Sequence, residues 1–548
     1  MGRTRFANGA EESFSRIINF IRSNPLIFMV YFIIFGIGLF FRLFVWWNYG
    51  TLQWDEASHS IGGILFYRFF VDNMLNPLDY LARYPAMTGS FWFYPYGYAL
   101  LAGISYLFFS FSEHVARLPS LIFSFLVIHA SICIAREIEH EHKVSFFSAF
   151  FAAVSPIIIV VGSGAMVDVP LTVLITYSLL FWVKGLKNRE DKDFLKAGIL
   201  GGFAGLMKPI GIFVLIFMLV FAVLLFAFLK DQLFFSKGFW KGILSGLGCF
   251  STWWGSAFMV NYLVNGWIGE AAIKGVMYWF DFKGIFGGYV PPWYSPPWYK
   301  IEAWGYYPHE LLFTTGLLPF ILVFVGFFSR LKKMKLVDVL LILFTLGFYV
   351  LQTFASNKNP RYIMPILPIL YAYAGVGLNF VFMSLVEEQK PLDLVGLKWL
   401  KRIVALAIVA IAMVNAFLPL QQALAVRYTP GMPYGLNFPV KECLQIIIND
   451  GEAGLLLVEG QDNLFNLPVV TFYLASLDKN GLYGCHPVPS DPGEILNLTS
   501  GGKKVRYILI QDLDSSVGKY VHDHPEIFIF LGKVEGSHMD VYIYKVKG

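Results

Sequence analysis

Residues 25–60 read PLIFMVYFIIFGIGLFFRLFVWWNYGTLQWDEASHS, a long apolar run followed directly by a cluster of ionisable residues. A helix that crosses a bilayer needs about 20 apolar residues, so this stretch predicts a transmembrane helix that ends near residue 47. Asp55, Glu56 and His59 then lie just beyond the membrane. Ionisable groups are costly at this boundary and are candidates for function. The stretch therefore predicts a membrane protein with polar chemistry at one membrane surface.

The composition of the whole chain agrees with this prediction. The chain has 548 residues, of which 57% are hydrophobic and only 14% are charged, and its mean hydropathy is +0.60. Soluble globular proteins carry about 25% charged residues. The net charge of +5 does not indicate a nucleic-acid partner, because the Lys and Arg side chains lie in short loops between apolar runs, where they set orientation.

The apolar runs predict a polytopic helical protein with about eleven spans. The segments that precede the odd-numbered spans are rich in Lys and Arg, so the positive-inside rule places them in the cytoplasm. Residues 94–111 are also apolar, but a span there would turn the basic loop 184–196 outward, so we expect a re-entrant or interfacial helix. The expected spans are 26–47, 117–135, 144–163, 169–186, 196–207, 210–229, 242–262, 310–329, 336–354, 362–384 and 403–422.

This threading divides the chain into three parts and gives it a cell-membrane location, with the large loops and the C-terminal part outside. Turn clusters and short β-rich runs such as GLLLVEG and DVYIYKV predict a small α/β domain at the C-terminus. It contains Cys443 and Cys485, and the sequence leaves open whether they form a disulfide. The expected parts are a cytoplasmic lead-in (1–24), a transmembrane catalytic domain (25–422) with external loops 48–116 and 263–309, and the external domain (423–548).

Carboxylates and cations recur at the external ends of the predicted spans. Together they predict a catalytic site with an anion-binding pocket. Taken singly, Asp55 and Asp168 could cap helices, Lys208 could snorkel to the interface and Arg361 could anchor a helix end. His59 follows Asp55 by four residues on the same helical face, and we favour a hydrogen-bonding role for it. The external ionisable residues are Asp55, Glu56, Asp168, Lys208, Lys358 and Arg361.

Six motifs occur in an order and with a sidedness that resemble a known superfamily. They are WDEASHS, EHVARLPS, AMVDVPL, GLMKPIG, WGYYPHELL and NKNPRYIMPILP. The chain resembles the protein O-mannosyltransferase and lipid A aminoarabinose transferase superfamily, whose members are C-type (GT-C) glycosyltransferases that use polyprenyl-phosphate sugars. The resemblance covers roughly residues 25–385. It implies a GT-C fold, transferase activity and a donor such as a dolichyl-phosphate sugar, with mannose as a family-level expectation.

The resemblance also implies roles for single residues. The catalytic aspartate falls on Asp55, followed by Glu56, and the second acidic position falls on Asp168. The donor phosphate would be held by the cations Lys208, Lys358 and Arg361. The Trp-Tyr-Tyr element falls on Trp304, Tyr306 and Tyr307, and we expect these residues, with His59 and Tyr94, to line the substrate site.

The chain departs from the aminoarabinose branch at two places. Ala57, Ser58 and His59 replace the Thr-Arg-Tyr that follows the acidic pair there, and Tyr94 and Pro95 stand where that branch has Glu-Lys-Pro. Two cations near the donor phosphate are therefore missing, and Arg83 would have to help Lys208 and Arg361 compensate. The mannosyltransferase branch carries a lumenal insert that this chain lacks, so the exact reaction stays open.

The expected reaction is an inverting transfer of a sugar to an acceptor hydroxyl at the outer membrane face. Asp55 would accept the hydroxyl proton, and Asp168 would orient the acceptor or share the role of base. The acceptor could be a protein, a glycan or a lipid, and an archaeal source fits the general style. A divalent cation, Mg²⁺ or Mn²⁺, on Asp55 and Glu56 stays open, because one adjacent acidic pair is thin evidence for a metal site.

Three other functions compete with this one. An oligosaccharyltransferase-like enzyme would move a whole glycan to asparagine, but the C-terminal signature of that family is missing. A transporter or flippase would place ionisable residues near mid-bilayer and show paired repeats, whereas here they crowd the external ends. A non-catalytic scaffold would tolerate replacement of Asp55 and Asp168.

Overall fold

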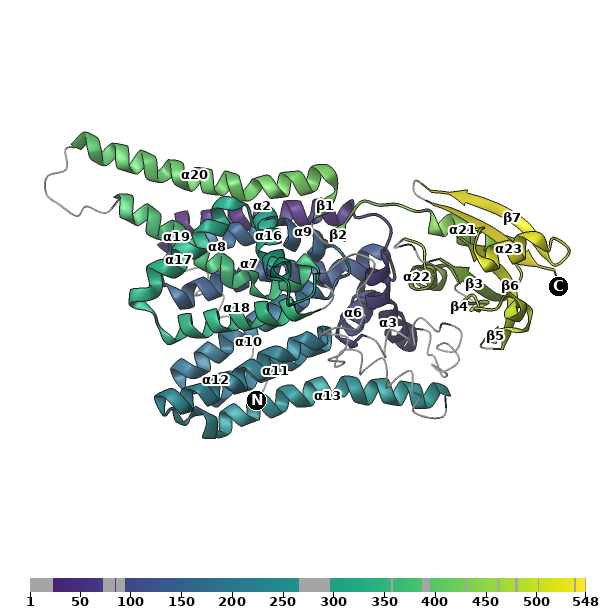
Figure 1. Cartoon of the computed structure of the whole chain (residues 1–548), viewed down its shortest axis with the longest axis horizontal. Helices are drawn as coiled ribbons and strands as arrows, with labels where there is room; N and C mark the ends of the chain where they lie inside the picture. Colours follow the sequence, from purple (N-terminus) through teal and green to yellow (C-terminus); the bar gives the residue numbers. More distant parts are fainter. Residues whose placement is uncertain are drawn as a thin grey trace.

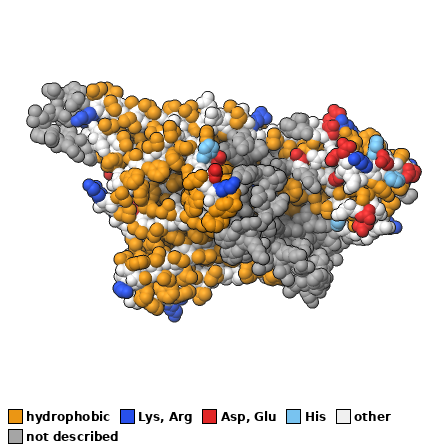
Figure 2. All heavy atoms as spheres, viewed as in Figure 1, with side chains coloured by type: hydrophobic (Ala, Val, Ile, Leu, Met, Phe, Trp, Pro, Cys, Tyr) orange, Lys and Arg blue, Asp and Glu red, His pale blue; other side chains and the backbone are white. Residues whose placement is uncertain are grey.

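The computed structural model describes residues 23–71, 84, 94–265, 296–355, 358–386, 395–429, 432–460, 462, 464–478, 481–500, 502–536 and 539–547. The chain forms a bundle of long helices joined at one end to a small α/β domain (Figure 1). Hydrophobic side chains cover the visible face of the bundle, whereas charged side chains gather on the α/β domain (Figure 2). This contrast is the one expected when a bundle lies in lipid and a domain lies in water.

The bundle contains seven helices that are long and apolar enough to cross a membrane, or nine spans if two bent pairs each count as one, among the described residues. Each of the eleven expected spans coincides with a helix or a pair of helices. Two of these helices, α11 and α13, are not among those long and apolar enough to cross a membrane. The elements are α2 (Pro25–Trp47), α7 (Glu113–Ile138), α8 (His142–Val154), α9 (Pro156–Ser163), α10 (Asp168–Asn188), α11 (Asp191–Met207), η1 (Pro209–Ile212), α12 (Phe213–Leu229), η2 (Gln232–Phe235), α13 (Lys237–Asn265), α16 (Ile301–Thr315), α17 (Leu317–Arg330), η3 (Leu331–Lys333), α18 (Leu336–Phe354), η4 (Pro360–Ile366), α19 (Leu367–Val386) and α20 (Val395–Val426).

A proline causes the 52° bend between α8 and α9. Pro156 has no N–H, so the carbonyl of Ala152 loses its helical donor. The guanidinium of Arg42, fully buried in α2, donates to the carbonyls of Ala152 at 3.2 Å and Ala153 at 2.9 Å. Because an unpaired carbonyl in an apolar interior is costly, Arg42 stabilises the bend that lets α9 lead towards Asp168.

Two helices from the segment between α2 and α7 lie between the bundle and the α/β domain, α3 (Trp54–Val71) and α6 (Gly97–Phe109) (Figure 1). They pack closely, because a Cβ on Gly63 would lie 2.8 Å from the backbone nitrogen of Gly103. At about 1.5 Å per residue, the 13 residues of α6 cover roughly 20 Å. This is too short to cross the hydrocarbon core, which agrees with the expected re-entrant or interfacial helix.

The C-terminal part is an α/β domain around a mixed sheet of strand order β4-β3-β6-β8-β7. β3, β4 and β6 are parallel, and β8 is antiparallel to β6 and β7. The expected strands over GLLLVEG, VRYILIQD, IFIFLGK and DVYIYKV are all present, and β4 was not expected. The elements are β1 (Tyr428–Thr429), β2 (Met432–Pro433), α21 (Val440–Asp450), β3 (Gly454–Glu459), α22 (Leu467–Leu477), β4 (Tyr483–Pro487), η5 (Pro492–Asn497), β5 (Thr499–Ser500), β6 (Lys503–Ile510), α23 (Ser516–Asp523), β7 (Phe528–Glu535) and β8 (Asp540–Val546).

The two cysteines of this domain are free and buried. Cys443 lies on α21 and Cys485 on β4, and burial raises the pKa of each thiol to about 12. Since the thiolate is the reactive form, these thiols behave as apolar core side chains in the structure.

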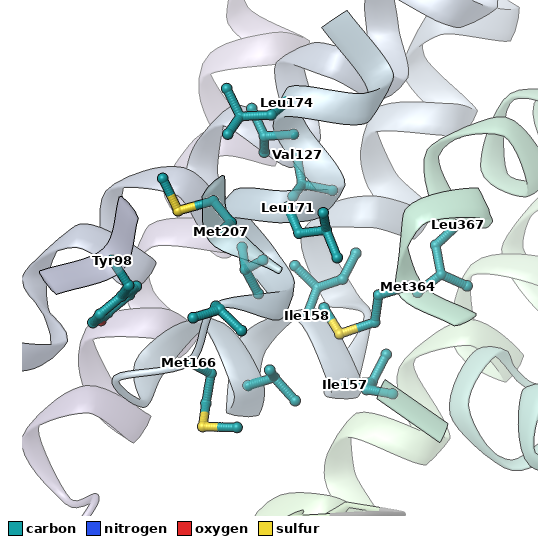
Figure 3. Packing of buried hydrophobic residues seen from close by; sticks show 14 of the residues in the cluster. Tyr98, Val127, Ile157, Ile158, Met166, Leu171, Leu174, Met207, Met364 and Leu367 are labelled. Atoms are coloured by element: carbon teal, nitrogen blue, oxygen red, sulfur yellow. The ribbon is translucent and has the colours of Figure 1, made fainter. Parts of the chain in front are cut away.

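The core of the bundle extends to α9, α10 and η4. Figure 3 shows Ile157 and Ile158 of α9, Leu171 of α10 and Met364 of η4 pointing into one packed region. All four side chains are nearly or completely buried. Close-packed side chains leave little room for neighbouring elements to shift. This region therefore fixes α10 against η4. Asp168 and Arg361 lie on those same two elements.

Candidate active site

Four charged side chains from four separate parts of the chain meet at one place in the structure. Arg361 Nη2 on η4 lies 2.5 Å from Asp55 Oδ2 on α3. Lys208 Nζ, in the turn after α11, donates to Asp168 Oδ1 at 2.9 Å. Arg361 Nε and Asp168 Oδ2 face each other at 3.8 Å. We call Asp55, Asp168, Lys208 and Arg361 the charged cluster.

The charged cluster is largely shielded from water, and Asp55 is its most exposed member. Asp55 is 35% exposed, whereas the side chains of Asp168, Lys208 and Arg361 are 2%, 14% and 13% exposed. Asp168 Oδ2 and Arg361 Nε are buried and have no hydrogen-bond partner within the described residues. A buried donor and a buried acceptor without partners are costly. The cluster therefore holds hydrogen-bonding capacity that a polar ligand could use.

Burial and charge act in opposite directions on Asp55. Burial alone would raise the pKa of its carboxyl, but the nearby positive charge of Arg361 outweighs burial and holds the pKa below its usual value. Asp55 is therefore ionised at neutral pH and can accept a proton only after its contact with Arg361 weakens. This property matters for any role as a general base.

Glu56 turns away from the charged cluster and forms a buried ion pair with Arg117 of α7. Its Oε1 accepts from Arg117 Nε at 2.9 Å and its Oε2 from Arg117 Nη2 at 3.2 Å, and both side chains are completely buried. Each oxygen also accepts one backbone N–H, from Ala165 at 2.8 Å and from Gln53 at 3.0 Å. A buried carboxylate satisfied in this way holds its surroundings in place.

The bonds to Glu56 fix both segments that carry the aspartates. Gln53 is the residue before α3, so Glu56 reaches back from the first turn to cap the helix that carries Asp55. Ala165 belongs to the turn before α10, which begins at Asp168. The two adjacent acids thus differ in role, since Asp55 joins the charged cluster and Glu56 anchors it.

The turn before Asp168 is also held by Ser120 of α7. Its hydroxyl donates to the carbonyl of Met166 at 2.6 Å and accepts the N–H of Met166 at 3.1 Å. His59 adds a third bond, since its Nδ1 lies 3.1 Å from the carbonyl of Ala165. A carbonyl only accepts, so Nδ1 carries the hydrogen. The predicted hydrogen-bonding role of His59 agrees with this geometry.

Aromatic rings line the charged cluster. The ring of Tyr94 packs edge-on against His59, with centroids 4.8 Å apart. Burial lowers the pKa of His59, so its ring is neutral at pH 7 despite the nearby Asp55. Lys208 Nζ lies 3.9 Å from the ring centroid of Tyr362, and the Arg361 guanidinium lies 5.5 Å from the same ring. Tyr362 therefore positions both cations.

Sequence reasoning missed Tyr362 and Arg117. Tyr362 follows Arg361 directly, and the aromatic neighbour of a cation is a weak signal because belts of Tyr are common at membrane interfaces. Arg117 offered a stronger signal. It lies in the apolar helix α7, and a buried guanidinium needs hydrogen-bond acceptors, of which a carboxylate is the strongest; Glu56 supplies that carboxylate.

Among the other predicted site residues, Lys358, Trp304 and Tyr306 bond to backbone carbonyls. Lys358 Nζ donates to the carbonyls of Pro296 and Ala355, at 2.9 and 2.8 Å, and so ties down its own loop. Trp304 and Tyr306 lie on α16, where they contact the carbonyls of Trp298 and Lys358, and Tyr307 is completely buried beside Tyr306. Arg83 falls outside the described residues.

The acidic pair does not fit a divalent cation. The oxygens of Glu56 are engaged with Arg117 and two backbone donors, and Asp55 Oδ2 is engaged with Arg361. No group of three or more His, Cys, Asp or Glu side chains with metal-binding geometry occurs in the part of the chain that the structure describes. The charges that would face a bound phosphate here are the Lys and Arg of the cluster.

Comparisons with known proteins agree with this architecture. Residues 94–255 match the model of the dolichyl-phosphate-mannose-protein mannosyltransferase family. No curated protein sequence matches the chain significantly. ArnT from Cupriavidus metallidurans, solved bound to undecaprenyl phosphate, has a TM-score of 0.61 at 14% identity and covers 96% of this chain and 98% of its own.

A second solved structure is similar at the level of the fold. The archaeal oligosaccharyltransferase AglB from Archaeoglobus fulgidus, in complex with an inhibitory peptide and a dolichol-phosphate, has a TM-score of 0.58 at 12% identity and covers 92% of this chain and 71% of its own. The resemblance that the six motifs indicated is thus confirmed: the chain is a multi-pass membrane protein with the GT-C fold, and its residues 94–255 carry the sequence pattern of the dolichyl-phosphate-mannose-protein mannosyltransferase family.

Proposed function

We propose that the chain is an inverting glycosyltransferase that moves a sugar from a polyprenyl phosphate to an acceptor hydroxyl. The observation that carries the proposal is the charged cluster, in which Arg361 contacts both Asp55 and Asp168 and Lys208 contacts Asp168. Two carboxylates beside two cations supply a base for the acceptor and a pocket for a phosphate leaving group.

Each step has a residue in reach. The acceptor oxygen attacks the anomeric carbon, the bond from that carbon to the phosphate oxygen breaks, and the lipid phosphate leaves with the electron pair. Asp55 accepts the proton of the acceptor hydroxyl. Arg361 and Lys208 neutralise the charge that grows on the phosphate. Attack from the face opposite to the phosphate inverts the configuration at the anomeric carbon.

Donor binding also releases Asp55 for its role. A phosphate that takes up the hydrogen bonds of Arg361 competes with Asp55 for the same guanidinium, since Arg binds phosphates strongly and in bidentate fashion. As this contact loosens, the pKa of Asp55 rises from its depressed value and the carboxylate becomes a better base. Asp168 Oδ2, buried without a partner within the described residues, is placed to orient the acceptor hydroxyl.

The family model and the fold of lipid-phosphate-bound relatives support a mannose-like sugar on a dolichyl or undecaprenyl phosphate. The distribution of Lys and Arg supports an extracytoplasmic location for the charged cluster and for the α/β domain. The acceptor is a protein, a glycan or a lipid that reaches this face of the membrane.

The test is a transfer assay with purified protein in lipid nanodiscs. Dolichyl- and undecaprenyl-phosphate mannose, radiolabelled in the sugar, are incubated with membrane extract as a source of acceptor. We expect label to move to the acceptor fraction with release of lipid phosphate, and Asp55→Asn to lower this turnover by about 10²- to 10⁴-fold, the usual contribution of a general base.

The control is Asp540→Asn, which removes a carboxylate from an ion pair with Lys533 on the α/β domain. It should keep wild-type turnover. Label that moves equally well with Asp55→Asn would exclude this carboxylate as the base. Label that crosses the membrane while still attached to its lipid would indicate a flippase instead.

A further inference from the structure

The segment between α2 and α3 pairs with the first residues of the α/β domain, and Arg117 of the bundle donates to its Gly50 carbonyl at 3.0 Å. We call residues 49–52 the joint strip. The carbonyl of Tyr49 accepts the N–H of Gly435 at 2.7 Å, and the N–H of Thr51 donates to the carbonyl of Leu436 at 3.0 Å. Gly50 and Leu436 form a parallel β-bridge. The strip thus pairs like a short strand with a segment far away in the sequence.

Side chains reinforce this pairing. The hydroxyl of Thr51 donates to the carbonyl of Phe438 at 3.1 Å and accepts the N–H of Phe438 at 3.0 Å. The hydroxyl of Tyr473, on α22, accepts the N–H of Leu52 at 3.1 Å. Thr51 and Tyr473 are both buried, with Tyr473 2% exposed. Bonds in such surroundings are costly to break, because the partners left behind stay unsatisfied.

The joint strip leads directly into the helix that carries Asp55. Gln53 precedes the first turn of α3, and Asp55 is the second residue of that turn. The far end of α3 is also tied to the α/β domain, since Arg68 Nη2 donates to the carbonyl of Ala475 at 3.1 Å. The helix is therefore attached to the α/β domain near both of its ends.

We infer that the α/β domain contributes, together with the Glu56–Arg117 pair, to the position of the catalytic base, with Thr51 and Tyr473 as positioning residues that act through the joint strip. This inference rests on the proposed function, and it assigns the domain a role in the transfer step. Arg361 is on η4, within the bundle, so the distance between Asp55 and Arg361 depends on how α3 is held against η4.

If the joint strip positions Asp55, a change in the strip should lower the rate of transfer without changing the affinity for the donor. The phosphate would be held by Lys208 and Arg361, which form no hydrogen bond with the joint strip among the described residues. Asp55, by contrast, moves with the strip. A displacement of about 1 Å at a reacting group can cost up to about 100-fold in rate, whereas the affinity for the lipid phosphate depends on groups that stay in place.

The test uses Thr51→Val and Tyr473→Phe, which remove the hydroxyls and keep the side-chain shapes. We expect kcat to fall about 10-fold or more while KM for dolichyl-phosphate mannose changes less than about threefold. Thr51→Ser keeps the hydroxyl and should restore turnover. The acidic limb of kcat/KM should move to higher pH in Thr51→Val, because Asp55 is held less closely by Arg361.

Tyr507→Phe is the matched control. Its hydroxyl lies in the same domain and bonds Asp450 at 2.6 Å, but it does not contact the joint strip. This variant should keep wild-type kcat and KM. If Thr51→Val and Tyr473→Phe lose no more turnover than Tyr507→Phe, or raise KM in proportion to the loss of kcat, the positioning role is refuted.

Hydrogen exchange separates this inference from the proposed function. In nanodiscs, amides of residues 53–60 should exchange faster in Thr51→Val and in Tyr473→Phe than in wild type, and at the wild-type rate in Tyr507→Phe. A chain that transfers no sugar but shows this pattern would overturn the proposed function and retain the attachment of α3. Unchanged exchange in both variants would overturn the attachment itself.

Discussion

Arg361 and Asp55 are separated by 306 positions in the sequence, yet Arg361 Nη2 lies 2.5 Å from Asp55 Oδ2. This contact joins η4 of the bundle to α3, which lies between α2 and α7 in the sequence. It holds a cation against the proposed base, and it lowers the pKa of that base despite its burial. The state of this contact therefore controls both the charge of Asp55 and the availability of Arg361 for a phosphate.

Replacing Arg361 with Gln should shift the pH dependence of transfer. The active form of a base is the deprotonated one, so kcat/KM falls as pH drops through its pKa. In wild type this fall lies below the usual Asp value of about 3.9. In Arg361→Gln the pKa of Asp55 rises, because burial then dominates, and the acidic limb moves to higher pH. Initial rates at saturating acceptor between pH 4 and about 8 measure the shift.

The contact between Asp55 and Arg361 also stabilises the folded protein in a pH-dependent way. The folded pKa of Asp55 is lower than the unfolded one, so the contribution is fully present above the unfolded pKa and is lost as pH falls through the folded pKa. Arg361→Gln should therefore lose less stability on acidification than wild type does. An acidic limb that stays in place in this variant would show that Arg361 does not set the charge of Asp55.

Lys208 and Lys358 should respond differently to the same substitution. Lys208→Gln removes a cation of the charged cluster and should raise KM for the donor about 10-fold, the scale of one charge-assisted hydrogen bond. Lys358→Gln removes a cation that bonds backbone carbonyls. It should lower the unfolding temperature and leave donor KM near wild type. The reverse pattern would assign the phosphate to Lys358, as its place in the sequence motif suggested.

Glu56→Gln should destabilise the protein strongly. It leaves the buried guanidinium of Arg117 without its countercharge, a change that costs about 3–5 kcal/mol when one partner of a buried pair is removed. Thermal unfolding in nanodiscs, followed by circular dichroism, measures the loss. The double variant Glu56→Gln/Arg117→Met should lose less than the sum of the two single changes, because the pair is removed as a unit.

Gly50→Ala should open the joint between the bundle and the α/β domain. Gly50 has φ of +88°, and a Cβ there would lie 2.2 Å from the carbonyl oxygen of Leu436. Gly451→Ala is the matched control, since Gly451 has φ of +82° but nothing lies within 4 Å of its Cβ. Both variants carry the cost of about 1 kcal/mol for a left-handed residue, and Gly50→Ala adds a clash with backbone. Equal unfolding temperatures would argue against close packing at the joint.

Much of the fold follows from the sequence because a bilayer restricts what a chain can do. Apolar runs such as residues 25–47 must form helices, since no other local structure satisfies the backbone in lipid. The bends are harder to predict. Pro156 predicts one bend, but the carbonyls freed at that bend are bonded by Arg42 of another helix, and the sequence does not indicate this contact. Two expected spans, α11 and α13, are helical but do not pass as spans on length and composition among the described residues.

The candidate site was predictable in part. The Lys and Arg content of the segments between spans predicts which end of each span faces which side of the membrane. On that basis Asp55, Asp168, Lys208 and Arg361 are predicted to lie on one side. The different partners of the two adjacent acids, Arg361 for Asp55 and Arg117 for Glu56, were not predictable. Asp55 and Glu56 are adjacent and chemically alike, and only the position of Arg117, on a different helix, draws Glu56 away from the cluster. The same holds for Lys358, whose orientation depends on the carbonyls around it.

The sequence by itself determined that this protein is a helical membrane protein with an α/β domain at its C-terminus, because hydropathy and β-rich patterning act over neighbouring residues. Tertiary structure alone decided which ionisable side chains meet. Contacts such as Arg361 with Asp55 and Thr51 with Phe438 join residues more than 300 positions apart. Coulomb forces and hydrogen bonds act over a few ångströms in space, and no local pattern in the chain records which distant partner comes within that range.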